Sequence, residues 1–437
     1  MIPFLLTLGL AQGLLCTALP LQPLRFNDDG AFKIALFTDL HYGESSELDL
    51  KSDEAQRMVL EQEKPDFIVF GGDMVSGWHA KGKDGWFQNR WHQLTAPARE
   101  FSIPYALVLG NHDDEGNLDR RQILQHDIDT SDGLSYTKQG PYRVGGASNY
   151  YIDIFPNPNA DTAPVEAPSG TGITNLLHPS KETKNVSSFS ANNVPVPLFS
   201  QNLAPTEPEP AARLWFFDSM NRGCLIQRNS WGCIAPTAIQ WASTISKTIP
   251  LVPTAMAFAH IPIPEVVNVW EQSTEPVYGR KREFSNCQGI NTGLHKFAKE
   301  NGVQAVWSGH DHVNDFVGVW EGVRIGYGRK SGYGSYFYGE TVDPVDSKKS
   351  FTDQRSSAVV PVQRGARIIE LRQGESANNA KNWIALESGV REYQRVIDKW
   401  LFSGPSEQTV CRSGAVAVST GVFCNIMLAI LAFYVIN

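Results

Sequence analysis

Residues 32–41 read FKIALFTDLH, an apolar run that favours a β-strand and ends in Asp39 and His41. Two later runs have the same form, and each also ends in polar side chains: FIVFGGD at 67–73 and YALVLGNH at 105–112. Helical patterns at 53–63 and 86–100 lie between them, with Ser52 as a possible first cap. This alternation predicts an α/β fold with a parallel sheet and crossover helices.

The second half of the chain repeats the pattern. Residues 254–260 (TAMAFAH) predict a strand, and residues 303–312 (VQAVWSGHDH) predict another. In such sheets, sites form at the carboxyl ends of the strands, so we expect the polar residues there to converge. They are Asp39, His41, Asp73, Asn111, His112, His260, His310 and His312.

These side chains could hold two divalent metal ions and leave one histidine for proton transfer. Asp39 and His41 alternate along an extended segment, so both could point to one ion, and the same holds for His310 and His312. The mixture of imidazole and hard oxygen suits zinc, manganese or iron and does not suit calcium.

Two such ions could lower the pKa of a bridging water, so that hydroxide attacks a phosphate ester at mild pH. Asp73 has two oxygens and could bridge them. His112 could protonate the leaving oxygen, with Asp113 or Asp114 orienting its ring. We therefore expect His112 and Asp113 to be the catalytic side chains.

Composition narrows the possible partners. The chain has 437 residues and a formal net charge of −8, so nucleic acid is not expected as a partner. Residues 157–213 are rich in Pro, Asn and Ser and predict a surface insertion of unknown role. The strand-like runs on either side, 149–155 and 214–218, are expected to pair, and 390–400 predicts a last helix.

The two ends predict a protein of the secretory pathway. Residues 1–19 resemble a signal peptide. The tail at 403–437 predicts membrane association, through a GPI-type anchor signal or a transmembrane helix. Four of the six cysteines would then remain, so two disulfides are plausible, with Cys224–Cys233 closing a short loop, and Asn185 begins a glycosylation sequon. We expect an extracellular, cell-surface or vacuolar location.

The series Asp-x-His, Gly-Asp, Gly-Asn-His-Asp, His and Gly-His-x-His resembles the calcineurin-like metallophosphoesterase superfamily. The resemblance implies a four-layer αββα sandwich of two mixed β-sheets flanked by helices, spanning 30–402. It also implies a dinuclear centre in which Asp73 bridges. One metal would be bound by Asp39, His41 and His312, and the other by Asn111, His260 and His310.

Within this superfamily the chain is most similar to the compact purple-acid-phosphatase-like branch, through FTDLH at 37–41, FGGD at 70–73, FFDS at 216–219 and WSGHDH at 307–312. The true purple enzymes carry a tyrosine three residues after the bridging aspartate, where this chain has Ser76. The resemblance therefore implies a metal site without a phenolate ligand or purple colour, which favours manganese, zinc or ferrous iron.

The expected function is hydrolysis of phosphate monoesters, on a small phosphate ester or a phosphoprotein. A sphingomyelinase-like phosphodiesterase is the alternative, and a non-catalytic scaffold is a third possibility. Residues 325–338 are rich in Gly and Tyr, and Tyr327, Arg329 and Tyr333 could line the substrate cleft, with Arg329 pairing to phosphate. An exposed aromatic turn would explain the same composition.

Overall fold

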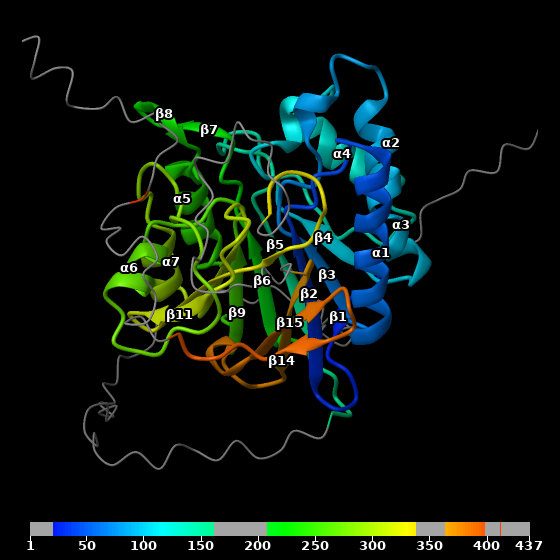
Figure 1. Ribbon diagram of the computed structural model, residues 1–437. Coiled ribbons are helices and arrows are strands. Elements are labelled where there is room, and N and C mark those ends of the chain that lie inside the picture. Colours follow the sequence, from blue (N-terminus) through cyan, green and yellow to red (C-terminus); the bar gives the residue numbers. More distant parts are fainter. Residues whose placement is uncertain (1–20, 161–207, 338–362, 398–410, 412–437) are drawn as a thin grey trace, which may run out of the picture.

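The computed structural model describes residues 21–160, 208–337, 363–397 and Cys411. It is a four-layer sandwich, in which two mixed sheets pack face to face and helices cover both outer faces (Figure 1). The predicted fold class is therefore confirmed. The signal peptide predicted at 1–19, the sequon at Asn185 and nearly all of the tail at 403–437 lie outside the described residues.

One sheet carries the first polar strand ends. Its strands, in spatial order, are β16 (Arg391–Glu392), β15 (Lys381–Leu386), β14 (Gly365–Arg372), β2 (Ala31–Thr38), β3 (Phe67–Phe70) and β4 (Tyr105–Leu107), and β13 (Arg329–Lys330) also pairs with β2. β2, β3 and β4 are parallel, as expected from the alternation of strand and helix. β14 runs antiparallel to β2 and closes the other side.

The second sheet carries the remaining polar strand ends. Its order is β1 (Leu24–Arg25), β5 (Tyr150–Phe155), β6 (Ala212–Phe216), β9 (Thr254–Phe258), β10 (Ala305–Ser308), β12 (Val323–Tyr327) and β11 (Val317–Trp320). β5 and β6 are antiparallel neighbours, as predicted for the strands on either side of the insertion. β6 begins at Ala212, so the last two residues of the predicted insertion belong to the sheet. A separate hairpin consists of β7 (Arg222–Cys224) and β8 (Gln227–Trp231).

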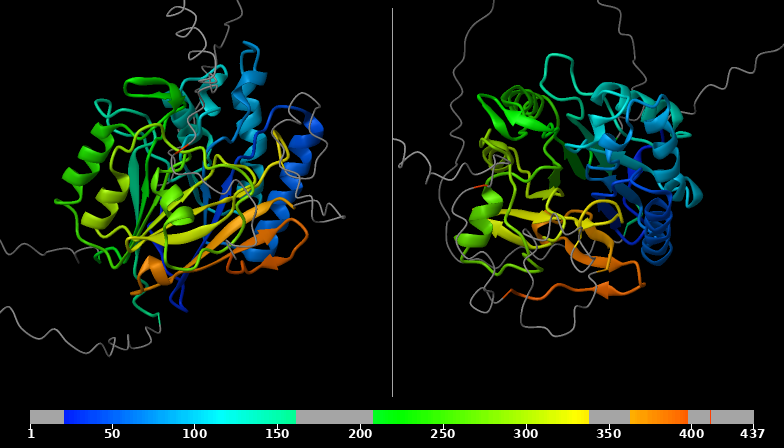
Figure 2. Two further views of the ribbon diagram at one scale, coloured as in Figure 1. Left: turned by 60° about the vertical axis from the view of Figure 1, so that its left-hand side comes forward. Right: turned by 45° about the horizontal axis from the view of Figure 1, so that its top comes forward.

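Helices from the two halves of the chain cover opposite faces, as the views in Figures 1 and 2 show. The first group is α1 (Ser46–Glu63), α2 (Trp86–Leu94), α3 (Ala96–Glu100) and α4 (Arg120–Thr130), and the second is α5 (Pro236–Ile245), α6 (Glu265–Glu271) and α7 (Leu294–Glu300). Short 3₁₀ turns lie at η1 (Gly77–His79), η2 (Asp113–Glu115) and η3 (Ala377–Asn379). No helix in these described parts is long and apolar enough to cross a bilayer.

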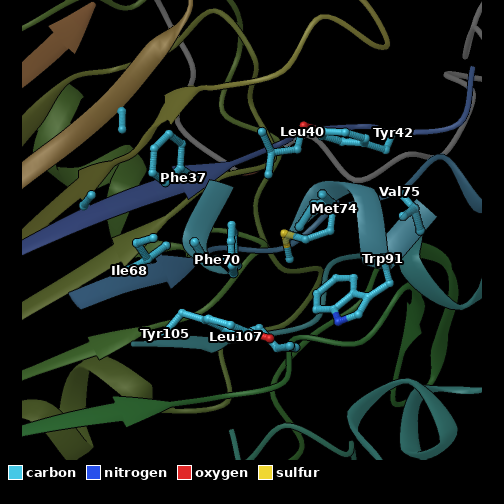
Figure 3. Packing of buried hydrophobic residues seen from close by; sticks show 14 of the residues in the cluster. Phe37, Leu40, Tyr42, Ile68, Phe70, Met74, Val75, Trp91, Tyr105 and Leu107 are labelled. Atoms are coloured by element: carbon cyan, nitrogen blue, oxygen red, sulfur yellow. The ribbon is translucent and has the colours of Figure 1, made fainter. Parts of the chain in front are cut away.

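β2 shows how the sequence builds the layers. Its side chains alternate, so that Phe32, Ile34 and Leu36 pack between the sheets, while Ala35 and Phe37 face the helices. Both sides are fully buried, which explains the nearly continuous apolar run. Figure 3 shows the helix side, where strand residues meet Trp91 of α2. Each large side chain buried in this way contributes about 1.5–3 kcal/mol.

Several predicted element boundaries are wrong. α1 begins at Ser46 because the side chain of Ser45 accepts a hydrogen bond from the Leu48 amide, whereas the predicted cap, Ser52, lies inside the helix. The helix predicted over 86–100 is interrupted at Thr95, ahead of Pro97. Residues 391–392 form β16 rather than a helix.

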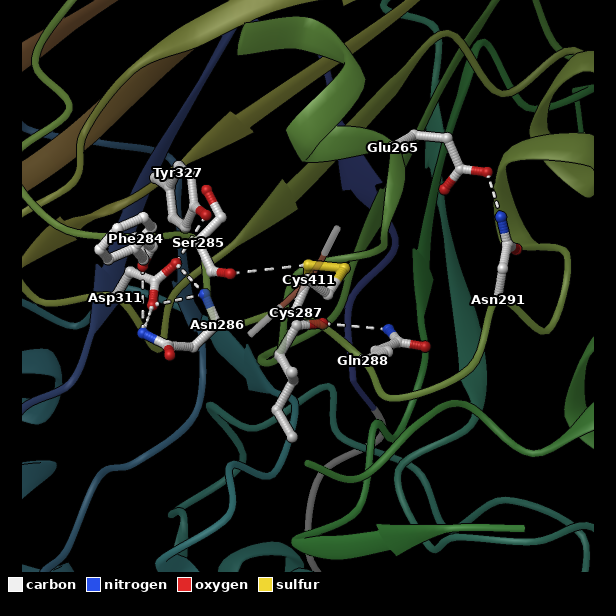
Figure 4. Close-up of a disulfide and its surroundings, with 11 residues drawn as sticks. Glu265, Phe284, Ser285, Asn286, Cys287, Gln288, Asn291, Asp311, Tyr327 and Cys411 are labelled. Carbon is white, nitrogen blue, oxygen red and sulfur yellow. Dashed lines mark hydrogen bonds between the residues drawn. A yellow bond between two sulfur atoms is a disulfide. The ribbon is translucent and has the colours of Figure 1, made fainter. Parts of the chain in front are cut away.

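Two disulfides are present among the described cysteines. Cys224 and Cys233 form the predicted short loop around the β7–β8 hairpin. Cys287 bonds to Cys411, 124 positions later in the sequence, and thereby ties the start of the tail to the body of the fold (Figure 4). Such pairing is typical of proteins that fold in an oxidising compartment.

Candidate metal centre

The carboxyl ends of five strands meet at one place, and the structure brings the expected ligands together there. Asp39 and His41 follow β2, Asp73 follows β3, Asn111 follows β4, His260 follows β9, and His310 and His312 follow β10. All of these side chains are buried.

The donor atoms form two adjacent groups. Asp39, His41 and His312 make one group and Asp73, His260 and His310 make the other, with the donor atoms of each group within 4.8 Å of one another. Asp73 lies between them, because its Oδ2 is 3.1 Å from Nε2 of His260 and 3.8 Å from Nε2 of His41. The two groups fit a dinuclear site, and their division matches the one that the resemblance implies.

Three of the four ligand histidines are held in place through their Nδ1 atoms. Nδ1 of His41 lies 3.0 Å from the Ser76 hydroxyl, and Nδ1 of His260 lies 2.9 Å from the carbonyl of Gly71. Nδ1 of His312 lies 2.8 Å from the carbonyl of Tyr336. Each contact fixes the ring and leaves Nε2 for the centre, as in histidines that bind metals.

Two buried atoms test whether a metal fits. Oδ1 of Asn111 and Nε2 of His310 have no hydrogen-bond partner, although burying an unpaired polar atom costs about 1–3 kcal/mol. Both belong to the residues expected to bind the second metal. A bound cation would satisfy them, so the residues present fit the metal centre.

The backbone at the ligands departs from the expected extended form. Asp39, His41, Asp73 and His310 have φ angles of 55°, 53°, 52° and 76°, in the left-handed region that residues with a Cβ rarely adopt. The predicted extended geometry is therefore wrong: Asp39 and His41 do meet in one group, as expected, but His310 and His312 belong to different groups. Turns past the strand ends aim these side chains instead, and such strain is common at functional sites.

Glycines allow the ligand loops to approach closely. A Cβ on Gly110 would lie 2.2 Å from the Asp73 nitrogen, and a Cβ on Gly309 would lie 1.9 Å from the Thr38 hydroxyl oxygen. That hydroxyl donates a 2.7 Å hydrogen bond to Oδ2 of Asp39. The glycines in these two motifs are thus required by packing around the carboxylates.

The electrostatics of the site show what a cation would replace. Burial alone would raise the pKa of Asp73, but the charge and hydrogen bond of His260 outweigh it and lower that pKa far below its usual range. In return, Asp73 overcomes the effect of burial and raises the pKa of His260 to about 9. Burial lowers the pKa of His310 to about 3. A metal bound here would take the place of the proton held between Asp73 and His260.

His112 lies beside the two groups, and its orienting partner is Glu115. Its Nδ1 lies 2.7 Å from Oε2 of Glu115, and its ring meets Trp78 edge-on at a centroid distance of 4.4 Å. Burial opposes protonation, but Asp73 and Glu115 raise the pKa of His112 above its ordinary value. The prediction that Asp113 or Asp114 orients the ring of His112 is wrong, because both carboxylates bind other groups.

Asp113 is a buried acceptor for the backbone of the ligand loops. Oδ1 accepts hydrogen bonds from the amides of Met74 and Val75, and Oδ2 accepts from those of Asp73 and Gly110, at 2.7–3.2 Å. It therefore braces the loops that carry Asp73 and Asn111. Asp114 instead pairs with Arg120 at 3.1 Å.

Two of the residues expected to line the substrate cleft, Tyr327 and Arg329, do not do so, whereas the place of Tyr333 stays a prediction. Tyr327 is fully buried and donates its hydroxyl proton to Asp311, and Arg329 is buried in an ion pair with Asp315. The hydroxyl of Tyr333 bonds to Glu387. The stretch at 325–338 is rich in turn residues, but Tyr327 lies in β12 and Arg329 lies in β13, and sheet pairing buries both side chains.

Asp311, the residue between the last two ligands, also turns away from the centre. It accepts hydrogen bonds from Tyr327 and from Asn286, next to the disulfide at Cys287 (Figure 4). This agrees with its exclusion from the predicted ligand set.

Sequence reasoning missed residues that surround the ligands without binding metal. Three aromatic side chains each contact a different histidine of the site: Trp78 on His112, Trp231 on His310 and Tyr336 on His312. Arg120 was also missed; it donates to the carbonyl of Gly110 and pairs with the buried Asp218 that follows β6. Only Asp218 lay in a recognisable motif.

Comparisons with known proteins agree with this geometry. The family model for calcineurin-like phosphoesterases matches residues 32–314. The chain is 30% identical over 411 residues to "Probable inactive purple acid phosphatase 28" of Arabidopsis thaliana, covering 87% of this chain and 84% of that protein. It is 27% identical to "Phosphatase DCR2" of Saccharomyces cerevisiae, over 68% of this chain and 46% of that one.

Among solved structures, a dimetal phosphatase from Danio rerio aligns with 80% of this chain and 98% of its own length, at 11% identity and a TM-score of 0.43. The family model and the Arabidopsis relative, rather than this structural likeness, show which family the chain belongs to. The chain belongs to the calcineurin-like phosphoesterase family.

Proposed function

We propose that this protein is an active, dinuclear-metal phosphatase that hydrolyses phosphate monoesters. The single observation that carries the proposal is the pair of adjacent groups of three buried donors, with Asp73 of one group 3.8 Å from His41 of the other. The Arabidopsis relative is named as inactive, so activity has to be argued from this chain's own residues. Here each group has three buried Asp or His donors, and Asn111 adds an oxygen with no hydrogen-bond partner.

A dinuclear centre, when bound, supplies a water of lowered pKa and a positive field for phosphate oxygens. The chain's residues would do the rest. Asp73, held through the His112 amide at 2.8 Å, fixes the spacing of the two groups. His112 is about one-fifth exposed, at 22%, and its raised pKa favours the protonated ring that a leaving oxygen needs.

Metal content is the first test of the proposal. We expect about two manganese, zinc or iron ions per chain after gentle purification. Asp73→Asn should lose metal and activity together, whereas His112→Ala should keep its metal and lose about 10²–10⁴-fold in kcat. His92→Ala is the matched control, because His92 is exposed on α2 away from the strand ends. Equal metal loss in the Asp73 and His112 variants would contradict the role proposed for His112.

Substrate class is the second test, because a phosphodiesterase of the sphingomyelinase-like kind could use the same site. We propose the monoesterase on the names of the relatives, which are phosphatases. The kcat/KM for an aryl monophosphate should exceed that for the bis-aryl phosphate. A preference for the diester would favour the alternative, and no turnover by fully metallated protein would favour a scaffold.

We also propose that the protein acts in the secretory pathway, outside the cell or in a vacuole, on small phosphate esters or phosphoproteins. Two disulfides support an oxidising compartment. Membrane association through residues 403–437 remains a prediction from the sequence. A phosphoinositide-specific lipase should release the protein from membranes if the tail directs a GPI anchor, whereas retention would favour a helix.

A further inference from the structure

We propose that Trp78 forms the leaving-group subsite and selects phosphate esters whose leaving group is a planar aromatic ring. This rests on the proposed function, because it assigns the substrate class of that same site. The starting observation is the contact of Trp78 with His112, at a centroid distance of 4.4 Å and an interplanar angle of 69°. The centroid of the same indole lies 5.9 Å from that of the His41 ring, so Trp78 lies next to both a metal ligand and the proposed proton donor.

Because Trp78 lies beside His112, its position determines which part of a substrate it would contact. A proton donor must lie within hydrogen-bond reach of the leaving oxygen. If His112 is that donor, the group attached to the oxygen has to pass beside the indole. Trp78 is thus placed to contact the organic part of the ester rather than its phosphate.

The indole is both accessible and fixed. Trp78 is 41% exposed, whereas the neighbouring Trp86 and Trp91 are buried in the core, so part of its surface is open to a ligand. Its turn is held to the His112 loop by a hydrogen bond from the Gly77 amide to the His112 carbonyl, at 3.2 Å. A Cβ on Gly77 would lie 2.5 Å from that carbonyl oxygen, so this close approach of the turn to the loop requires glycine at position 77.

A second aromatic ring supports the assignment from the other side of the site. Tyr336 stacks on His312 at 4.1 Å and is 44% exposed, while its hydroxyl is bonded to Glu283. His312 in turn lies next to His41, with their ring centroids 5.0 Å apart. Two exposed aromatic rings therefore contact histidines of the site, and Trp78 is the one that contacts His112. Aromatic pairs add about 0.5–1.5 kcal/mol beyond area burial, which corresponds to roughly two- to twelvefold in affinity.

Binding of non-hydrolysable ligands tests this independently of turnover. Dissociation constants of phenylphosphonate and methylphosphonate are measured by calorimetry on manganese-loaded protein. We expect the wild type to prefer phenylphosphonate by about three- to tenfold. Trp78→Leu should remove this preference and leave methylphosphonate binding unchanged, and Trp78→Phe should restore most of it. Trp320→Leu, on β11 away from the ligand-bearing strand ends, is the matched control.

Two results would overturn the proposal. One is an unchanged preference in Trp78→Leu. The other is an equal loss of both phosphonates, which would show that the indole only supports His41 and His112. Failure of the proposed function looks different: selective phenylphosphonate binding without hydrolysis of phenyl phosphate would refute the activity alone. Hydrolysis without any phenyl preference would refute the Trp78 subsite alone.

Discussion

Replacing Asp113 with alanine separates a structural role from a catalytic one. The carboxylate accepts four backbone hydrogen bonds, from Met74, Val75, Asp73 and Gly110. Each amide left unsatisfied by Asp113→Ala costs about 1–3 kcal/mol, which gives a ceiling of roughly 4–12 kcal/mol for the four. Water can enter the space of the lost carboxylate, so we expect about 3–5 kcal/mol, as for other broken buried charge networks.

Thermal unfolding and metal titration measure the consequence. At about 2 °C per kcal/mol for a large domain, Tm should fall by roughly 6–10 °C. The loops that carry Asp73 and Asn111 lose their common brace, so metal affinity should fall by about 10–100-fold. Asp113→Asn keeps one acceptor oxygen and should lose about half as much stability. Asp129→Ala, at an exposed position of α4, should change stability by no more than about 0.5 kcal/mol.

Added manganese distinguishes bracing of the loops from a direct part in catalysis. In Asp113→Ala, excess manganese should restore most of kcat, because the defect lies in metal retention. A variant that unfolds at the wild-type temperature and binds two metals, yet has lost 100-fold or more in kcat, would refute the bracing role. It would return Asp113 to the catalytic role expected from the sequence, that of orienting the ring of His112.

Three further predictions follow from the geometry of the site. Glu115 raises the pKa of His112, and activity that depends on protonated His112 is lost as the pH rises through that pKa. Glu115→Gln should therefore move the alkaline limb of the pH–rate profile to lower pH. An unmoved limb would exclude Glu115 as the partner of His112. Gly110→Ala should abolish metal binding, because its Cβ would clash with Asp73 at 2.2 Å, and a metallated variant of normal activity would contradict this packing. Chelation of the wild type should lower its stability by about 4 kcal/mol for each metal ion lost, relative to a metal concentration of 1,000 Kd, and an unchanged Tm would mean that no metal is bound.

The ligand set was predictable from the sequence because each ligand follows an apolar strand. Parallel strands place their carboxyl ends at one edge, so order along the chain was enough to predict that Asp39 and His260, 221 positions apart, would meet. The strand pattern also predicted that β5 and β6 pair across the insertion.

The supporting residues could not be predicted in this way. Glu115 and Asp113 differ by two positions, and nothing in the sequence says which faces His112; the 3₁₀ turn at 113–115 decides it. Tyr327 and Arg329 were misplaced because turn composition suggested a loop, whereas sheet pairing buries both. At 391–392, pairing with β15 and the contact of Arg391 with Glu63 override the helical pattern.

The left-handed backbone at Asp39, His41, Asp73 and His310 has an evolutionary consequence. Such conformations cost of order 1–2 kcal/mol per residue, and glycine would adopt them without strain. Replacement of these ligands by glycine would therefore relieve strain at the site. An enzyme of this kind can thus lose its metal ligands and become a stable, non-catalytic relative. A chain that retains all four side chains keeps a cost in stability that metal binding can help to offset.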